Sequence, residues 1–337
     1  MIKSPEPLKD FGNPASFSGA GLGAQYPLVV LGFNPVPFSG TGRIPHPPPN
    51  NNLKHRTMNK NLFSQNTILF RPETTQTKKK KIIKELLNKY IIKDMNDWFN
   101  VNADLIITDP PFGIEFSGKP TNYHRNANNV VDGYVEWRVS EYGEKIQQLL
   151  ECIKRNLKEN GQALVFSGWN NSNIIHDRIM KFKGLTLRGK MYWTYNFAPV
   201  CRKKPSHNVY EIYWITKGDK WIYNNRCNTV HCQRGEPNLS TLNFKRDYKV
   251  NMPKYPTRLP FKLLQCLIEH FSNKNSLIFD PLCGSGMVGV VSYMLGRDFI
   301  MGDLNKNGKI VFEHLLDYYL NKKGLIQDQK LLTWWKK

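Results

Sequence analysis

Long apolar runs and acidic residues are both scarce in this chain of 337 residues. No run of about eighteen apolar residues occurs, so we expect no membrane-spanning helix and no membrane partner. Only 27 Asp and Glu residues stand against 48 Lys and Arg residues, and the formal net charge is +21. Such an excess of positive charge attracts phosphate but says nothing about the fold. We therefore expect a nucleic-acid partner, although a coding bias toward Lys could supply part of the charge.

The chain also lacks a regular cysteine pattern. Its six cysteines are spaced too irregularly for the disulfide framework of a secreted protein. Cys227, His231 and Cys232 lie near one another, with Cys201 and His207 upstream, but this spacing does not match a zinc motif. The sequence therefore predicts no metal site. A secretory signal is absent too, and we expect an intracellular protein, either cytoplasmic or associated with the nucleoid.

Hydrophobic periodicity is missing from residues 1–57, which are crowded with Gly, Pro, Ser and Asn. The stretch Pro45–Asn52, for example, contains four prolines and three asparagines. Segments of this composition cannot bury enough apolar surface to pack a core. We expect residues 1–57 to be disordered or loosely attached, and residues 58–337 to form one domain. No pattern in the chain indicates its oligomeric state.

The most informative stretch is Asp109-Pro110-Pro111-Phe112, which follows the apolar run Ala103–Thr108. The run predicts a buried strand, and two consecutive prolines end it. Asp109 should then lie on a stiff turn at the carboxyl end of a strand, where open α/β sheets bind their ligands. A carboxylate, a rigid carbonyl and an aromatic ring can together hold an exocyclic amine while the ring stacks on its base. The same residues could also be only a strand followed by a turn.

A second buried strand, beginning at Leu277, leads into the glycine loop Asp280-Pro281-Leu282-Cys283-Gly284-Ser285-Gly286. Glycines let the backbone approach a ligand closely, and the helix predicted over Val288–Leu295 offers free amide donors at its N-terminus. A third short strand, Phe299–Gly302, ends at Asp303. This acid follows the loop by about twenty residues, the offset at which a carboxylate binds ribose hydroxyls in Rossmann-like sites.

These segments together resemble the DNA amino-methyltransferases that use S-adenosylmethionine. The D-P-P-F stretch is similar to the catalytic motif of that family, and the glycine loop is similar to its cofactor loop. The catalytic motif comes first, which resembles the permuted order of the β group. A third match is Tyr255-Pro256-Thr257-Arg258-Leu259-Pro260, which resembles the H-P-T-Q-K-P motif of the family. The resemblance covers about residues 90–320.

The resemblance implies a Rossmann-like α/β fold, with a mixed seven-stranded sheet and helices on both faces. It assigns catalysis to the residues of the D-P-P-F motif: Asp109, Pro110, Pro111 and Phe112. It assigns S-adenosylmethionine binding to the glycine loop, the acid after the third strand and the third motif: Asp280, Pro281, Cys283, Gly284, Ser285, Gly286, Asp303 and Thr257. Tyr255 and Leu259 replace the usual His and Lys of the third motif, so the contact that such a Lys would make is missing.

DNA contacts are expected between the catalytic motif and the cofactor loop. Residues 217–253 lack a clear period, and their place in the family pattern assigns them target recognition. Arg202-Lys203-Lys204 follows several aromatic residues, and basic side chains beside aromatic ones suit phosphate contact and stacking. The same three residues could instead belong to a solvated loop after a core strand.

The implied activity is methyl transfer to an exocyclic amine of DNA. Asp109 and the carbonyl of Pro110 would each accept one amine hydrogen, while Phe112 stacks on a base flipped out of the duplex. We favour adenine N6 over cytosine N4, because the cytosine-N4 members more often carry Ser where this chain has Asp109. The covalent route through C5 of cytosine is excluded, because no Pro-Cys dipeptide occurs in the chain. Cys283 is expected to pack as a small apolar residue.

Two other classes stay open at this point. One is methylation of RNA or of a protein amide, although such relatives tend to carry Asn before the proline pair and to place the cofactor loop first. The other is a catalytically silent DNA-binding relative, against which the intact Asp109, Phe112, Gly284, Gly286 and Asp303 argue. The family resemblance also makes a cognate restriction endonuclease a conceivable partner.

Overall fold

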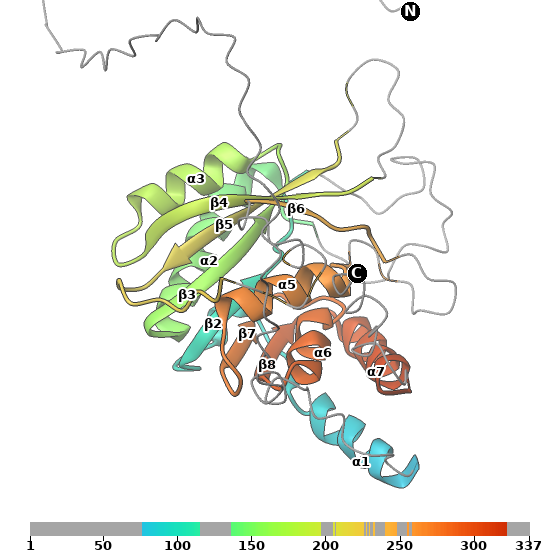
Figure 1. Ribbon diagram of the computed structural model, residues 1–337. Coiled ribbons are helices and arrows are strands. Elements are labelled where there is room, and N and C mark those ends of the chain that lie inside the picture. Colours follow the sequence, from blue (N-terminus) through green and yellow to red (C-terminus); the bar gives the residue numbers. More distant parts are fainter. Residues whose placement is uncertain are drawn as a thin grey trace, which may run out of the picture. The chain divides into compact units, whose positions relative to one another are not determined.

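The computed structural model describes residues 76–114, 136–196, 205, 207–225, 227, 229, 232, 240–247, 255 and 258–321. These residues form one mixed sheet of eight strands with helices packed against it (Figure 1). The expected segment 1–57, the residues Arg202-Lys203-Lys204 and Thr257 lie outside the described residues. Within the described part, no helix is both long and apolar enough to cross a membrane.

The sheet consists of a parallel half and an antiparallel half. Its strands are β1 (Tyr90–Ile92), β2 (Ala103–Thr108), β3 (Leu157–Ser167), β4 (Thr186–Thr194), β5 (Val209–Thr216), β6 (Thr241–Asn243), β7 (Leu277–Asp280) and β8 (Asp298–Asp303). Their order across the sheet is β1-β8-β7-β2-β3-β5-β4-β6. The five strands from β1 to β3 in this order are parallel, whereas β5 runs antiparallel to both β3 and β4.

Helices cover both faces of the sheet because the strand residues alternate between two apolar clusters. The helices are α1 (Gln76–Leu87), α2 (Tyr142–Asn156), α3 (Ser172–Lys181), α5 (Phe261–Phe271), α6 (Met287–Met294) and α7 (Lys306–Asn321). Leu105 and Ile107 of β2 pack in the cluster that contains residues of α1, α5, α6 and α7. Ile106, between them, packs in the opposite cluster with residues of α2 and α3.

The expected fold class is confirmed, but the sheet has eight strands where seven were expected. The strand without a sequence signal is β6, which lies inside the aperiodic segment 217–253. Only three residues long, it pairs in parallel with the end of β4. A strand so short has too few residues for an alternating pattern to be read, and its pairing with β4 is a tertiary contact.

Helix α5 is buried on nearly all sides. Ten of its eleven residues are buried. The reason is that the segment after β5 packs against the helix on the side away from the sheet core. Asn224 makes this attachment, since its backbone amide donates to the carbonyl of His270 at 2.7 Å and its side-chain amide donates to the carbonyl of Glu269 at 2.9 Å.

Candidate active site

The sheet brings the two main sequence motifs to one edge. Strands β2 and β7 are parallel neighbours, with Leu105 paired to Ile278 and Ile106 paired to Phe279. From β7 the chain continues to β8 on one side, and from β2 it continues to β3 on the other side. Such a reversal of strand order opens a crevice outside the carboxyl ends of the two strands. Asp109 and the glycine loop therefore meet at the point where this fold binds ligands.

Asp109 is the most perturbed acid on the β2 side of the crevice. Its Oδ1 atom is buried and has no hydrogen-bond partner among the described residues. Burial raises the pKa of Asp109 to about 7, while the charge of Arg246 opposes this rise and that of Glu136 adds to it. A buried acceptor without a partner costs about 1–3 kcal/mol. Such an atom marks a place where a ligand could supply the missing donor.

Arg246, whose charge lowers the pKa of Asp109, lies in a cage of three aromatic rings. Its guanidinium lies 4.3 Å from the ring centre of Tyr195, 4.9 Å from that of Trp193 and 5.1 Å from that of Tyr210. No sequence pattern points to Arg246, which follows β6 in the aperiodic segment. The aromatic residues around it are a partial signal for this part of the site, because they precede Arg202-Lys203-Lys204, for which the sequence predicts DNA contact. The cage holds a positive charge close enough to Asp109 to lower its pKa.

Phe112 is held in place by a neighbouring aromatic ring and by the turn that follows β3. Its ring contacts Tyr210 edge-to-face, with the ring centres 5.2 Å apart. The side-chain amide of Asn171 donates to the backbone carbonyls of Phe112 and Gly113 at 2.7 and 3.0 Å. Gly168 leaves room for the ring, because a Cβ atom at this position would lie 2.9 Å from it. The turn between β3 and α3 therefore supports the D-P-P-F motif.

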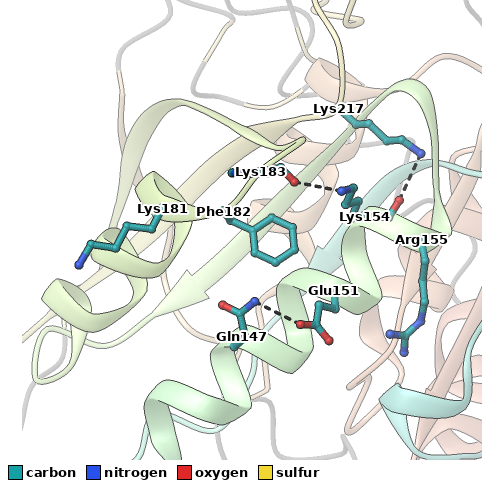
Figure 2. A pocket seen from close by; sticks show the side chains of 8 residues that line it. All are labelled: Gln147, Glu151, Lys154, Arg155, Lys181, Phe182, Lys183 and Lys217. Carbon is teal, nitrogen blue, oxygen red and sulfur yellow. Dashed lines mark hydrogen bonds between the residues drawn. The ribbon is translucent and has the colours of Figure 1, made fainter.

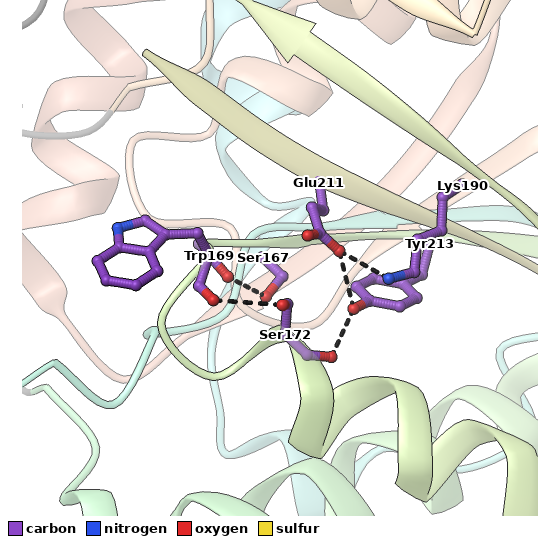
Figure 3. A network of polar contacts seen from close by, with 7 residues as sticks. Ser167, Trp169, Ser172, Lys190, Glu211 and Tyr213 are labelled. Carbon is purple, nitrogen blue, oxygen red and sulfur yellow. Dashed lines mark hydrogen bonds and ion pairs between the residues drawn. The ribbon is translucent and has the colours of Figure 1, made fainter. Parts of the chain in front are cut away.

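This supporting turn is itself fixed by a polar network that includes residues of β5 (Figure 3). The hydroxyl of Tyr213 donates to the carbonyl of Ser172 at 2.6 Å and contacts the carboxylate of Glu211 at 3.0 Å. Lys190 of β4 donates to the same carboxylate at 2.9 Å. Trp169 points away from this network in Figure 3, is half exposed, and stacks on His207 at 4.2 Å between ring centres.

The glycine loop on the β7 side is shaped by two left-handed residues. Gly284 has φ of 49° and Gly286 has φ of 75°, conformations that side chains rarely adopt. The amide of Gly284 donates to Asp303 at 2.8 Å, and the hydroxyl of Tyr90 donates to the Gly284 carbonyl at 2.7 Å. Gly308 approaches the same carbonyl so closely that a Cβ atom there would lie 2.3 Å from it. Strands β1, β7 and β8 thus fix the loop against the start of α6.

The other predicted cofactor residues lie in or beside this loop. Asp280, Pro281, Cys283 and Ser285 are buried. Burial raises the pKa of the Cys283 thiol well above its ordinary value, which agrees with a neutral packing residue. Tyr255 begins the third motif, and its hydroxyl would be 3.3 Å from a Cβ atom at Gly284. The third motif therefore begins next to the glycine loop.

A groove of about 660 Å³ lies elsewhere in the molecule, lined by the last turns of α2 and the segment after α3 (Figure 2). It carries several cations, but Lys154, Arg155 and Lys217 all donate to backbone carbonyls. Because α2 ends at Asn156, just before β3 begins, the groove lies at the opposite edge of the sheet from Asp109. These three side chains pair with backbone carbonyls near the ends of helices and strands. We therefore do not assign the groove to the active site.

A glycine loop and a D-P-P-F turn on adjacent parallel strands, at the switch point of an α/β sheet, define a Rossmann-like methyltransferase. Residues 103–310 match the model of the family N6_N4_Mtase, described as DNA methylase. The match covers more than half of the chain, which therefore belongs to this family of DNA methylases. This membership confirms the expected class of enzyme and its DNA substrate. It also confirms S-adenosylmethionine as the methyl donor.

Individual relatives agree with this membership. The chain is 24% identical over 233 residues to the DNA adenine methyltransferase YhdJ of Escherichia coli strain K12, an alignment that covers 60% of this chain and 72% of the relative. It is 26% identical over 243 residues to the type II methyltransferase M.HpaI of Haemophilus parainfluenzae, covering 68% and 73% respectively. Among solved structures, the cytosine-N4-specific PvuII DNA methyltransferase superposes with a TM-score of 0.53 at 15% identity, covering 72% of this chain and 89% of that one. The last likeness shows the shared fold.

Proposed function

We propose that this protein methylates the exocyclic N6 amine of adenine in DNA, with Asp109, Pro110, Pro111 and Phe112 as its catalytic motif. The observation that carries the proposal is the buried Oδ1 atom of Asp109, which has no partner among the described residues. It lies at the carboxyl end of β2, beside the strand that carries the glycine loop. An amine that enters the crevice would give this atom the donor it lacks.

The chemistry requires a nitrogen lone pair that is not delocalised into the base. Asp109 accepts one amine hydrogen and the carbonyl of Pro110 accepts the other, so the nitrogen becomes tetrahedral with its lone pair free. S-adenosylmethionine, when bound, supplies a methyl group on a positively charged sulfur. The rate gain then comes from orientation and from acceptors fixed in advance, which the proline pair makes rigid.

The target base has to leave the duplex to reach Asp109, because its amine is stacked and paired there. Phe112 offers a ring on which the flipped base can stack, and its edge-to-face contact with Tyr210 fixes the angle of that ring. Stacking of a base on an aromatic side chain contributes about 1–3 kcal/mol. The neighbouring charge of Arg246 keeps more of Asp109 ionised than burial alone would allow.

Cofactor binding falls to the β7 side of the crevice in this proposal. The left-handed Gly284 and Gly286 turn the loop into the start of α6, whose first backbone amides have no acceptor within the helix. Asp303 already accepts from the amides of Gly284 and Asn305, and each of its oxygens keeps a lone pair for a ribose hydroxyl. Asp280, Pro281, Cys283 and Ser285 complete the wall, and Thr257 belongs to the same set by resemblance.

Adenine is preferred to cytosine because Asp109 precedes the proline pair, and the E. coli relative is named an adenine methyltransferase. We assign target recognition to residues 217–253 and phosphate contact to Arg202-Lys203-Lys204, and we place residues 1–57 outside the methyltransferase domain. A cognate restriction endonuclease and a location in the cytoplasm or at the nucleoid follow from the type II relatives as further parts of the proposal.

The first experiment is to incubate the purified protein with unmethylated DNA and S-adenosylmethionine, and to analyse the digested nucleosides by mass spectrometry. We expect N6-methyladenine with the wild type and none with Asp109→Ala, which should still bind the cofactor. N4-methylcytosine would keep the mechanism and change the base. Cofactor binding without any methylated nucleoside would contradict the DNA substrate and point to RNA or protein. An active Asp109→Ala variant would contradict the role of Asp109.

A further inference from the structure

Three cysteines and one histidine converge beside α5, at a place that the active site does not use. Cys266 and His270 lie four residues apart on α5, so their side chains project from the same face of the helix. Cys227 and Cys232 come from the segment between β5 and β6, which packs against that face. The sequence predicts no metal site, because the spacing of Cys227, His231 and Cys232 does not match a zinc motif.

The distances among these side chains match those of a tetrahedral metal site. The sulfurs of Cys227 and Cys266 are 3.5 Å apart, and the sulfur of Cys232 is 3.0 Å from Nε2 of His270. The ligand atoms of Cys227, Cys266 and His270 all lie within 4.8 Å of one another. Bonds of about 2.3 Å to sulfur and 2.0–2.1 Å to nitrogen would place tetrahedral ligand atoms about 3.5–3.8 Å apart. Small shifts would therefore centre an ion among the four.

The histidine ring is oriented for coordination. Its Nδ1 atom makes a hydrogen bond with the backbone carbonyl of Asn224, which acts as the acceptor, so Nδ1 carries the proton. Nε2 is then the unprotonated nitrogen, and it is the one that faces the sulfurs. A ligating histidine usually donates its other N–H to a carbonyl or carboxylate in this way. Tyr223 stacks on the same ring, with the planes 11° apart, and holds its tilt.

Packing alone does not account for this arrangement. A buried cysteine is commonly a small apolar residue, and Cys152 on the other face of the sheet fits that description. Apolar packing by itself would not orient an imidazole nitrogen toward three thiols. Three thiolates and one imidazole favour zinc among the common divalent ions, and four protein ligands leave no open position for a substrate.

We propose that Cys227, Cys232, Cys266 and His270 bind one structural zinc ion that fastens the segment after β5 to helix α5. The same segment continues to β6 and then to Arg246, the cation beside Asp109. The ion would therefore stabilise the path of the chain that delivers this arginine to the active site. The proposal does not depend on which base is methylated.

The test is the zinc content of the full-length protein, purified from cells supplied with zinc and measured by plasma mass spectrometry. We expect about one zinc per chain in the wild type, and well below that in Cys227→Ser, Cys232→Ser and His270→Gln. Cys152→Ala is the matched control, because it removes a buried cysteine outside the cluster and should keep the zinc. A wild type without zinc would overturn the proposal. So would a variant that combines Cys227→Ser, Cys232→Ser and His270→Gln and still retains zinc.

A variant that fails to fold would also lose zinc, so a second measurement uses the wild type alone. Zinc is removed with a chelator and replaced by cobalt(II), whose absorption reports its ligands. Thiolate-to-cobalt charge transfer together with strong visible bands indicates a tetrahedral sulfur-rich site and supports the proposal. A spectrum without thiolate charge transfer, or a disulfide between Cys227 and Cys266 in the purified protein, contradicts it.

Discussion

At the scale of single residues, the proposed chemistry depends on the balance between Asp109 and Arg246. Burial favours the protonated acid, whereas the arginine favours the carboxylate, and the resulting pKa is about 7. The arginine is kept in position by the rings of Trp193, Tyr195 and Tyr210, which attract its charge without neutralising it. The charge of Arg246 therefore acts against the effect of burial on the Asp109 pKa.

The rate of methyl transfer should therefore rise with pH through about 7, because the carboxylate is a much stronger acceptor for the amine hydrogen than the protonated acid is. Arg246→Gln removes the charge that lowers the Asp109 pKa, so its profile should move to higher pH. Arg188→Gln is the control, since Arg188 also lies over an aromatic ring, that of Trp221, at 4.4 Å. The measurement is single-turnover methylation between pH 5.5 and 9. Superimposable profiles for wild type and Arg246→Gln would refute the coupling.

The same acid should make the folded protein less stable as pH rises. The Asp109 pKa is raised from 3.8 to about 7, so the folded state holds a proton that the unfolded state releases between these values. The favourable contribution is complete below about pH 4 and is lost as pH rises through 7. Asp109→Asn stays neutral, and its free energy of unfolding should exceed that of the wild type by up to a few kcal/mol at pH 8.

Urea unfolding at pH 5 and pH 8 measures this difference. The free energy of unfolding of Asp109→Asn, relative to that of the wild type, should be larger at pH 8 than at pH 5. Any packing cost of the substitution is the same at both pH values. An equal gap at the two pH values would mean that Asp109 is not protonated in the folded state at pH 5.

At the scale of secondary-structure elements, the turn between β3 and α3 sets the position of Phe112. Gly168→Ala places a methyl group 2.9 Å from the Phe112 ring, so the ring has to move. We expect methylation to slow by about tenfold or more, because small displacements of a positioned group are costly, with little loss of stability. Gly189→Ala is the control, since its nearest neighbour is 4.0 Å away on Trp214. Equal activity of the two variants would show that the turn does not position the ring.

The glycine loop allows a sharper comparison between two left-handed glycines. Gly286→Ala combines a φ of 75° with a Cβ atom only 2.6 Å from the Phe312 ring, whereas Gly296→Ala has φ of 71° and nothing within 4 Å. Both should lose about 1–2 kcal/mol of stability from backbone strain. Only Gly286→Ala should also weaken S-adenosylmethionine binding, measured by titration calorimetry. A similar loss of affinity in both would assign the effect to general destabilisation.

The elements also differ in how far the sequence predicts them. Strands β2, β7 and β8 are continuous apolar runs that end in motifs, so their existence and the residues at their carboxyl ends could be read directly. Strand β6 and Arg246 could not, because a three-residue strand has no period and the arginine gains its role only by contact with β4 and β5. The cluster of Cys227, Cys232, Cys266 and His270 was missed for a similar reason, since its two halves come together only when the segment after β5 packs on α5.

At the scale of the whole molecule, the net charge of +21 should dominate encounter with DNA. Each phosphate contact releases counterions, so the logarithm of affinity should fall linearly with the logarithm of salt concentration. For six or more contacts the loss between 50 and 200 mM salt would be about 10³-fold or greater. Fluorescence anisotropy with a labelled duplex measures it, and S-adenosylmethionine binding over the same range is the control. A flat salt dependence would contradict a phosphate-binding role for the charge.

The pairing of β2 with β7 has a consequence for folding during synthesis. Strand β2 and its neighbour β3 leave the ribosome early, but β7 is made only after Leu277 is added, on the order of ten seconds later at ordinary rates. Until then one edge of β2, five of whose six residues are buried in the folded protein, has no strand to pair with and can pair with other chains. A truncated chain that ends before β7 should therefore aggregate rather than form a stable partial fold.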